Sequence, residues 1–172
     1  MTEQNPMKKV RLEKVVLSCG ATGPNLEKAK KLLEMITERK AQIVNSGPKR
    51  RIPNFNVKPD MPLGTSVTLR GKIASELLKR LLVAIDNKLR RKQIARNGFS
   101  FGIQEYIEIP GLEYKREIGI RGLNVTASFI RAGVRVKRKK IKAGKLPERQ
   151  HVHPDEIMEF MKQNFNTEMI GK

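Results

Sequence analysis

Apolar residues recur at helical intervals in three parts of the chain. The longest series repeats every four residues, at Ile73, Leu77, Leu81, Ile85 and Leu89. Because residues four apart lie on one face of a helix, this series predicts an amphipathic helix from about Lys72 to Leu89. The same period predicts helices over 24–39 and 154–165, each with a proline at its first position, where no backbone N–H is needed.

Alternation of apolar and polar residues predicts strands elsewhere. In the segment 65–70, Val67 and Leu69 face one way, and Thr68 and Arg70 face the other. Further strands are expected over 11–18, 42–45, 99–109 and 123–131. Ala132-Gly133 favours a turn, so the next segment, 134–142, is expected to form the basic outgoing strand of a hairpin.

The order of these elements predicts an α+β fold. We expect a single domain over residues 1–172, with an open, mainly antiparallel sheet, helices packed on one face and a long basic loop. The basic hairpin and a C-terminal helix would occupy the residues from about 131 to 172. Polar residues on the other face of the sheet, such as Ser18 and Arg70, are then available to a ligand.

The loop between the strands at 42–45 and 65–70 combines stiffness with positive charge. Its prolines at 53, 59 and 62 fix backbone angles and remove hydrogen-bond donors, so the loop is neither helix nor inner strand. It carries cations around one aromatic ring, at Lys49, Arg50, Arg51, Phe55 and Lys58. Cations for phosphates and a flat ring for a base or ribose suit a structured RNA. The alternative is a solvated loop whose Phe55 and Val57 pack onto the core.

Charge narrows the choice of partner. The chain contains 36 Lys and Arg against 17 Asp and Glu, a net charge of +19. Because such an excess repels itself in a compact chain, a polyanionic partner is expected. Residues 131–145 alone hold eight cations and no anion. The cations at 88–92 would crowd the end of the longest helix, where they also complement its dipole. A disordered polycation is the alternative, and the periodic apolar segments argue against it.

The sequence shows neither a catalytic constellation nor a membrane segment. The single cysteine, Cys19, excludes an internal disulfide, and without a general base beside it a buried thiol is expected. His151 and His153 have no cysteine near them in sequence, so a metal site is not expected; His153 suits a helix start and His151 the solvent. No apolar run approaches the roughly 18 residues of a membrane span, and no apolar leader opens the chain. We therefore expect a cytoplasmic protein with no membrane partner, metal, cofactor or enzyme activity.

Several segments resemble large-subunit ribosomal protein L five. The matching residues occur in order at 11–18, 54–55, 61–71, 99–111 and 118–125. The short start, the basic segment and the C-terminal helix are similar to the archaeal and eukaryotic branch of that family. The resemblance implies a ribosome-bound structural protein whose partners are 5S rRNA, large-subunit rRNA, P-site tRNA and neighbouring ribosomal proteins of the central protuberance.

The resemblance also assigns roles to individual residues. It places 5S rRNA contacts on the first strand, the entry to the first helix and the strand at 65–70, at Lys9, Arg11, Ser18, Asn25, Thr68 and Arg70. It places tRNA-facing residues in the loop at 49–60, at Lys49, Arg50, Arg51, Asn54, Phe55 and Lys58. The basic run after residue 131 is expected to bind other rRNA through Arg135, Lys137, Arg138, Lys139 and Lys140.

Two other functions fit the residues without the resemblance. An RNA-processing or RNA-modifying enzyme would need a cleft with a bound metal, a cofactor or shifted carboxylates. A general nucleic-acid-binding protein would bind duplex DNA and structured RNA with comparable affinity, because phosphate contacts alone carry no sequence information.

Overall fold

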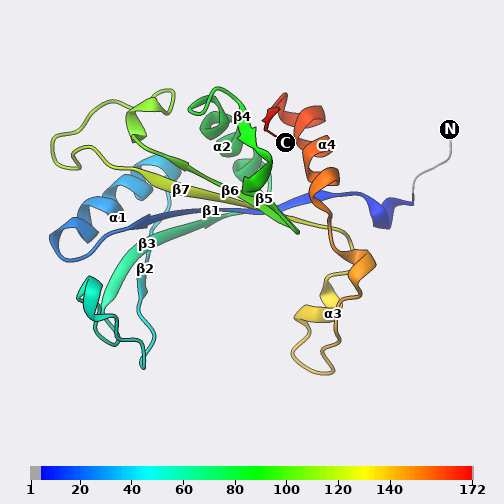
Figure 1. The fold of residues 1–172 in the computed structure, drawn as a ribbon, viewed down its shortest axis with the longest axis horizontal. Helices are drawn as coiled ribbons and strands as arrows, with labels where there is room; N and C mark the ends of the chain where they lie inside the picture. The colour runs from blue at the N-terminus through cyan, green and yellow to red at the C-terminus, as the bar shows by residue number, and fades with distance from the viewer. Residues whose placement is uncertain (1–4, 172) are drawn as a thin grey trace. The chain divides into compact units, whose positions relative to one another are not determined.

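The structure, a computed structural model, describes residues 5–171 and has an α+β fold with a mainly antiparallel sheet, as predicted (Figure 1). The main sheet contains β1 (Arg11–Gly20), β2 (Gln42–Asn45), β3 (Pro62–Leu69), β5 (Ile94–Ala95), β6 (Gly98–Ile103) and β7 (Leu123–Ile130). Its strand order is β2-β3-β1-β7-β6-β5. A second sheet pairs the short strands β4 (Lys88–Arg90) and β8 (Glu168–Ile170) in parallel.

The chain divides into two compact units. Unit 1 comprises the described parts of Met1–Val15, Arg70–Phe101 and Thr126–Lys172. Unit 2 comprises Val16–Leu69 and Gly102–Val125. Three strands, β1, β6 and β7, pass from one unit into the other, so neither unit is a continuous stretch of sequence.

Unit 2 is built on α1 (Pro24–Thr37), which packs against β3. The buried apolar side chains of α1 follow the helical period of the sequence, at Ala29, Leu32, Leu33 and Ile36. The helix ends because Glu38 takes a left-handed conformation with φ 52°, from which its N–H donates to the Glu34 carbonyl. β3 pairs antiparallel with β2 and begins at Pro62, earlier than the predicted start at Thr65.

Unit 1 contains α2 (Lys72–Val83), α3 (Arg135–Arg138) and α4 (Pro154–Phe165), and α4 has the bounds predicted for it. Its core includes a series of aromatic rings. The Phe99 and Phe129 ring centroids lie 5.8 Å apart, and Phe160 of α4 meets Phe129 edge-on at 5.4 Å. Among residues 5–171, no helix has the length and apolar character needed to cross a membrane.

The helix predicted over 72–89 is too long, because α2 ends at Val83. Asp86 and Asn87 have positive φ angles of 54° and 56°, and the Asn87 N–H donates to the Leu82 carbonyl at 2.9 Å. These two residues turn the chain into β4. Leu89 is buried, but it belongs to this strand and not to a helix. The cations at 88–92 consequently do not complement a helix dipole.

The strand predicted over 99–109 ends at Ile103 and gives way to a 3₁₀ turn at Tyr106–Glu108. Tyr106 is fully buried, and its hydroxyl accepts the Lys115 N–H at 2.8 Å. Its ring occupies the core. Ile107, which would share the face of Phe101 and Ile103 if the predicted strand continued to residue 109, is exposed. Glu105, a charged residue at a position where the alternation of Phe101 and Ile103 would place an apolar one, precedes the turn.

The prediction of a strand over 134–142 is wrong, because residues Arg135–Arg138 form the single helical turn of α3. The Lys137 N–H donates to the Val134 carbonyl and the Lys139 N–H to the Arg135 carbonyl, both at 3.1 Å. Val136 is 45% exposed and Val134 is half-buried, so the two alternating valines do not form a buried strand face.

Candidate nucleic-acid interface

The loop between β2 and β3, residues 46–61, is closed at its base by Ser46; we call it the basic loop. The buried Ser46 Oγ donates to the Lys58 carbonyl at 2.6 Å and accepts the Met61 N–H at 3.1 Å. The Ser46 N–H also donates to the Met61 carbonyl at 2.8 Å. One serine therefore ties the two ends of the basic loop together, a role that no pattern in the sequence had indicated.

The tip of the basic loop is a small closed turn. Ile52 and Val57 each donate a backbone N–H to the other's carbonyl at 3.1 Å. The chain between them forms a 3₁₀ turn at Pro53–Phe55 and reverses at Asn56, which has φ 51°. Val57 is buried, whereas the Phe55 ring is 76% exposed. The alternative in which both residues pack onto the core is thus right for Val57 and wrong for Phe55.

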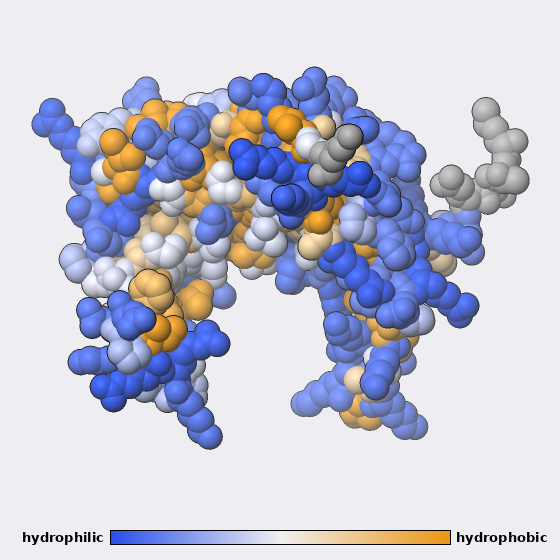
Figure 2. Space-filling view, in the orientation of Figure 1, coloured by the Kyte–Doolittle hydropathy of each residue, from blue (hydrophilic) through white to orange (hydrophobic). Residues whose placement is uncertain are grey.

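The cations of the basic loop face solvent. The predicted tRNA-facing residues are all exposed, namely Lys49, Arg50, Arg51, Asn54, Phe55 and Lys58. Within residues 5–171, none of the four cations lies within ion-pair distance of an acidic side chain. In Figure 2 this loop, at the lower left, is mostly hydrophilic with a hydrophobic patch among the polar residues. The loop therefore offers uncompensated charge beside an exposed ring.

The predicted 5S rRNA residues divide between the units. Lys9, Arg11 and Arg70 belong to unit 1, and all three are exposed. In unit 2, Asn25 and Thr68 are exposed and Ser18 is half-buried.

Arg121 adds a cation to this part of unit 2 that the sequence did not single out. Its Nη2 donates to the Asn25 side chain at 2.6 Å, and its Nε donates to the Ile118 carbonyl at 3.4 Å. The guanidinium is thus fixed at the first turn of α1, next to a residue predicted to contact RNA. Only the folded path of the irregular segment 112–122 brings it there.

The basic run after residue 131 is folded, and its predicted RNA-binding residues are exposed. These are Arg135, Lys137 and Arg138 of α3, with Lys139 and Lys140 directly after it. Arg131, at the start of the run, instead donates to the Glu156 carboxylate of α4 and to the Arg149 carbonyl. The run is consequently anchored at one end by a structural arginine and presents its other cations outward.

Glu13 of β1 connects two of the predicted RNA-binding residues within unit 1. Arg70, directly after β3, places its Nη1 3.6 Å from the Glu13 Oε1. Arg138 of α3 donates from Nη2 to the same oxygen. The sequence had pointed to 5S rRNA for Arg70 and to other rRNA for Arg138, whereas the structure brings the two guanidiniums to one carboxylate.

Cys19 is a buried thiol, as expected. Its Sγ lies 3.3 Å from the Gly122 carbonyl oxygen. Burial raises the pKa of Cys19 above its ordinary value of 9.0, and the positive charge of Arg121 opposes this rise without cancelling it. The thiol therefore stays protonated at neutral pH, which makes it a poor nucleophile.

The two histidines have structural contacts. His153 precedes α4, and its N–H donates to the Glu156 carboxylate at 3.0 Å, in keeping with the predicted helix-start role. His151 is half-buried rather than solvated, with Nδ1 2.7 Å from the Asn97 side-chain nitrogen. In the described part of the chain, no group of three or more His, Cys, Asp or Glu residues is arranged to hold a metal ion.

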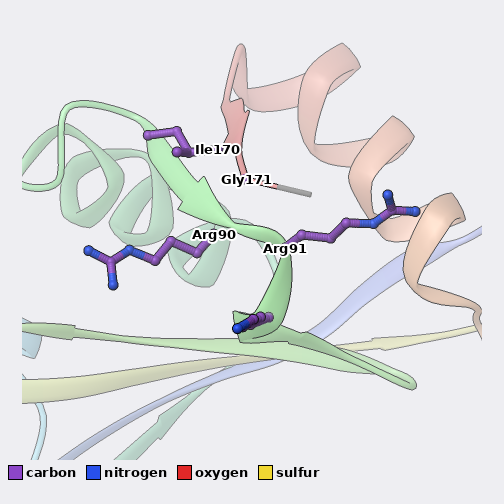
Figure 3. A pocket seen from close by; sticks show the side chains of 5 residues that line it. Arg90, Arg91, Ile170 and Gly171 are labelled. Carbon is purple, nitrogen blue, oxygen red and sulfur yellow. The ribbon is translucent and has the colours of Figure 1, made fainter.

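An open recess of about 360 Å³ in unit 1 is lined by Arg90, Arg91, Lys92, Ile170 and Gly171. Figure 3 shows the Arg90 and Arg91 side chains pointing in opposite directions. The two guanidiniums therefore do not converge on one point of the recess.

Comparison with known proteins gives a consistent result. The model of the C-terminus of the ribosomal protein L five family matches residues 62–163. Large ribosomal subunit protein uL5 of Nanoarchaeum equitans is 38% identical over 170 residues, which cover 97% of this chain and 99% of that protein. The protein of the same name from Sulfurisphaera tokodaii is 42% identical over 170 residues, covering 96% and 95%. That from Sulfolobus acidocaldarius is 36% identical over 171 residues, covering 98% and 95%.

A folded chain with a charge of +19, an exposed basic loop and an exposed basic run belongs to the class of RNA-binding structural proteins. Within that class, the chain belongs to the uL5 family of large ribosomal subunit proteins, in its archaeal form. This membership confirms the predicted role as a ribosome-bound structural constituent and sets aside the RNA-processing enzyme.

Proposed function

We propose that the protein binds 5S rRNA and contacts P-site tRNA through the basic loop. The single observation that carries the proposal is the Phe55 ring, 76% exposed at the tip of a loop that is closed at both its base and its tip. Single-stranded bases stack on exposed aromatic rings, and cations beside such a ring bind the phosphates of the same strand. Four cations without acidic partners in the described chain supply phosphate contacts around it.

The proposal gives the other surfaces separate partners. Five of the predicted residues are exposed, which supports contact with 5S rRNA: Lys9 just before β1 and Arg11 at its start, Asn25 in the first turn of α1, Thr68 near the end of β3 and Arg70 directly after it. The exposed cations at 135–140 support contact with large-subunit rRNA. Neighbouring ribosomal proteins of the central protuberance would complete the assembly.

Filter binding to 5S rRNA tests the first half of the proposal. A tRNA and a duplex of the same length serve as competitors at two salt concentrations. If six to ten phosphates are neutralised, affinity falls about a thousandfold or more between roughly 50 and 200 mM salt. A preference for 5S rRNA that survives the higher salt supports the proposal. Equal binding to all three nucleic acids, lost at the higher salt, would instead indicate a general nucleic-acid-binding protein.

A double substitution tests the basic loop. Arg51→Ala with Phe55→Ala removes one cation and one exposed ring, so tRNA binding by reconstituted subunits should fall while 5S rRNA binding stays nearly unchanged. Tyr114→Ala with Arg116→Ala is the matched control, because it removes an exposed ring and an exposed cation from another loop of unit 2. Loss of 5S rRNA binding in the loop variant would show that the two surfaces are assigned wrongly.

A further inference from the structure

Glu13 has the most enclosed carboxylate among the ion-paired acids of residues 5–171, with a side chain 10% exposed. Its two partners are far more open: the side chain of Arg70 is 58% exposed and that of Arg138 is 51% exposed. All three residues belong to unit 1. A carboxylate removed from water needs compensation by charge or hydrogen bonds, and here both guanidiniums supply it.

The charge of this cluster is not balanced. One carboxylate faces two guanidiniums, so the cluster keeps one positive charge. Each guanidinium has five N–H donors, and the contacts to Glu13 use only a few of them. The remaining donors belong to side chains that are half-exposed, so they are available to an acceptor from outside the protein. An anion that bridges the two guanidiniums would neutralise the remaining charge.

We propose that Arg70 and Arg138 form one binding site for a phosphodiester group of RNA, and that Glu13 positions both without touching the phosphate. The inference rests on the proposed RNA binding and merges two surfaces that the sequence had kept apart. Guanidinium forks match phosphate oxygens in a bidentate geometry, and a fixed carboxylate behind them reduces the entropy lost on binding.

The surroundings favour a nucleic-acid backbone over an acidic side chain of a protein. Arg11 lies two residues from Glu13 on β1, and Lys137, Lys139 and Lys140 flank Arg138; all are exposed. A single acidic side chain would satisfy one position, whereas consecutive phosphates of a strand would satisfy several. The phosphate could come from 5S rRNA or from large-subunit rRNA, which share this chemistry.

Glu13→Gln separates positioning from simple electrostatics because the two predict opposite signs. The substitution raises the net charge by one, so charge alone would tighten RNA binding. If Glu13 positions the guanidiniums, affinity should instead fall about tenfold, the loss of one well-oriented charge-assisted contact. Glu148→Gln is the control: it makes the same charge change in unit 1 at a side chain that is 93% exposed, and it should leave affinity unchanged or slightly raised.

The measurement is filter binding of the full chain to a 5S rRNA transcript and, separately, to deproteinised large-subunit rRNA. The RNA that loses affinity for Glu13→Gln supplies the phosphate. Arg138→Lys keeps the charge but removes the guanidinium fork, so it should lower the affinity for the same RNA. Because both arginines would bind one phosphate, the loss of affinity in a variant carrying both Arg70→Lys and Arg138→Lys should be smaller than the sum of the two single losses. Thermal melts followed by circular dichroism show whether each variant is folded. If Glu13→Gln does not fold, Arg138→Lys and Arg70→Lys still test the proposal.

The outcomes distinguish this inference from the function on which it rests. If the unsubstituted protein prefers neither RNA over a duplex competitor, the proposed function fails. If it binds RNA selectively but Glu13→Gln and Arg138→Lys bind as tightly as Glu148→Gln, the cluster is purely structural and only the inference is overturned.

Discussion

Replacing Ser46 with alanine should loosen the basic loop without unfolding the protein. The substitution removes the 2.6 Å hydrogen bond from Oγ to the Lys58 carbonyl and the 3.1 Å bond from the Met61 N–H to Oγ. The Met61 N–H keeps a long contact of 3.4 Å to the Lys58 carbonyl, and the backbone bond between Ser46 and Met61 remains. At about 1 kcal/mol for each net hydrogen bond, less this compensation, the expected cost is about 1.5 kcal/mol.

Amide hydrogen exchange measures this cost where it falls. A cost of about 1.5 kcal/mol raises the opening equilibrium of the loop roughly tenfold. Exchange at the Ile52 and Val57 amides, which bond to each other's carbonyls, should therefore accelerate by that factor. The Tyr106 amide, which donates to the Arg121 carbonyl elsewhere in unit 2, should be unaffected.

Ser100→Ala is the matched control, because Ser100 is exposed on β6. It should leave the Ile52 and Val57 amides unchanged. Two results would refute the reasoning about Ser46: unchanged exchange at both loop amides, or an equal acceleration throughout the chain, which would mean that Ser46 supports the whole fold and not the loop.

Three further predictions concern stability. Phe129→Ala should lower the free energy of unfolding by about 3–5 kcal/mol in urea denaturation, since it removes the ring between Phe99 and Phe160; a loss below about 1 kcal/mol would mean the ring stack contributes little. Gly64→Ala should cost about 1–3 kcal/mol in the same assay, because a Cβ there would lie 2.7 Å from the Cys19 carbonyl oxygen; an unchanged midpoint would contradict that contact. In the folded protein the pKa of Cys19 is raised above 9.0. The contribution of the protonated thiol to the free energy of unfolding is therefore complete below pH 9.0 and is lost as the pH rises through the folded pKa. The stability advantage of the unsubstituted protein over Cys19→Ala should therefore shrink above about pH 9, and a constant difference would contradict it.

Periodic elements and the short strand β2, observed at its predicted bounds Gln42–Asn45, were predictable from the sequence, whereas irregular elements and some element ends were not. The bounds of α4 follow from its first-turn proline and from Ile157 and Met161, which are buried one turn apart. The helix predicted over 72–89 was too long because Leu89 matches the four-residue apolar spacing of the helix although it lies in a strand. The positive φ of Asp86 and Asn87 is compatible with their residue types but is not required by them. The pairing of β4 with β8 has no signal in the sequence, because three-residue strands carry no periodicity.

The candidate interface shows the same division. Composition and local runs of charge identified most of the exposed cations, since charge is read from single residues and charged side chains are mostly exposed; Arg131, whose side chain is 12% exposed, is an exception. No sequence pattern indicated Ser46 or Glu13, because each acts through contacts with residues distant in the chain: Ser46 with Lys58 and Met61, and Glu13 with Arg70 and Arg138. Residues that hold a binding surface in place can therefore be identified only from the tertiary structure, whereas the cations of that surface can be identified from the sequence.

Because unit 1 is discontinuous in sequence, its last residues are synthesised after unit 2 is complete. Every residue of unit 2 has been made once Val125 is added, whereas unit 1 still lacks Thr126–Lys172. At roughly 5–20 residues per second, the interval between synthesis of Phe99 and of Phe160, whose ring completes the aromatic stack, lasts on the order of 3–12 seconds. During that interval the apolar surface of unit 1 is unfinished and open to chaperones or to aggregation. The first strand to be made, β1, likewise lacks its sheet neighbour β7 until Ile130 has been added.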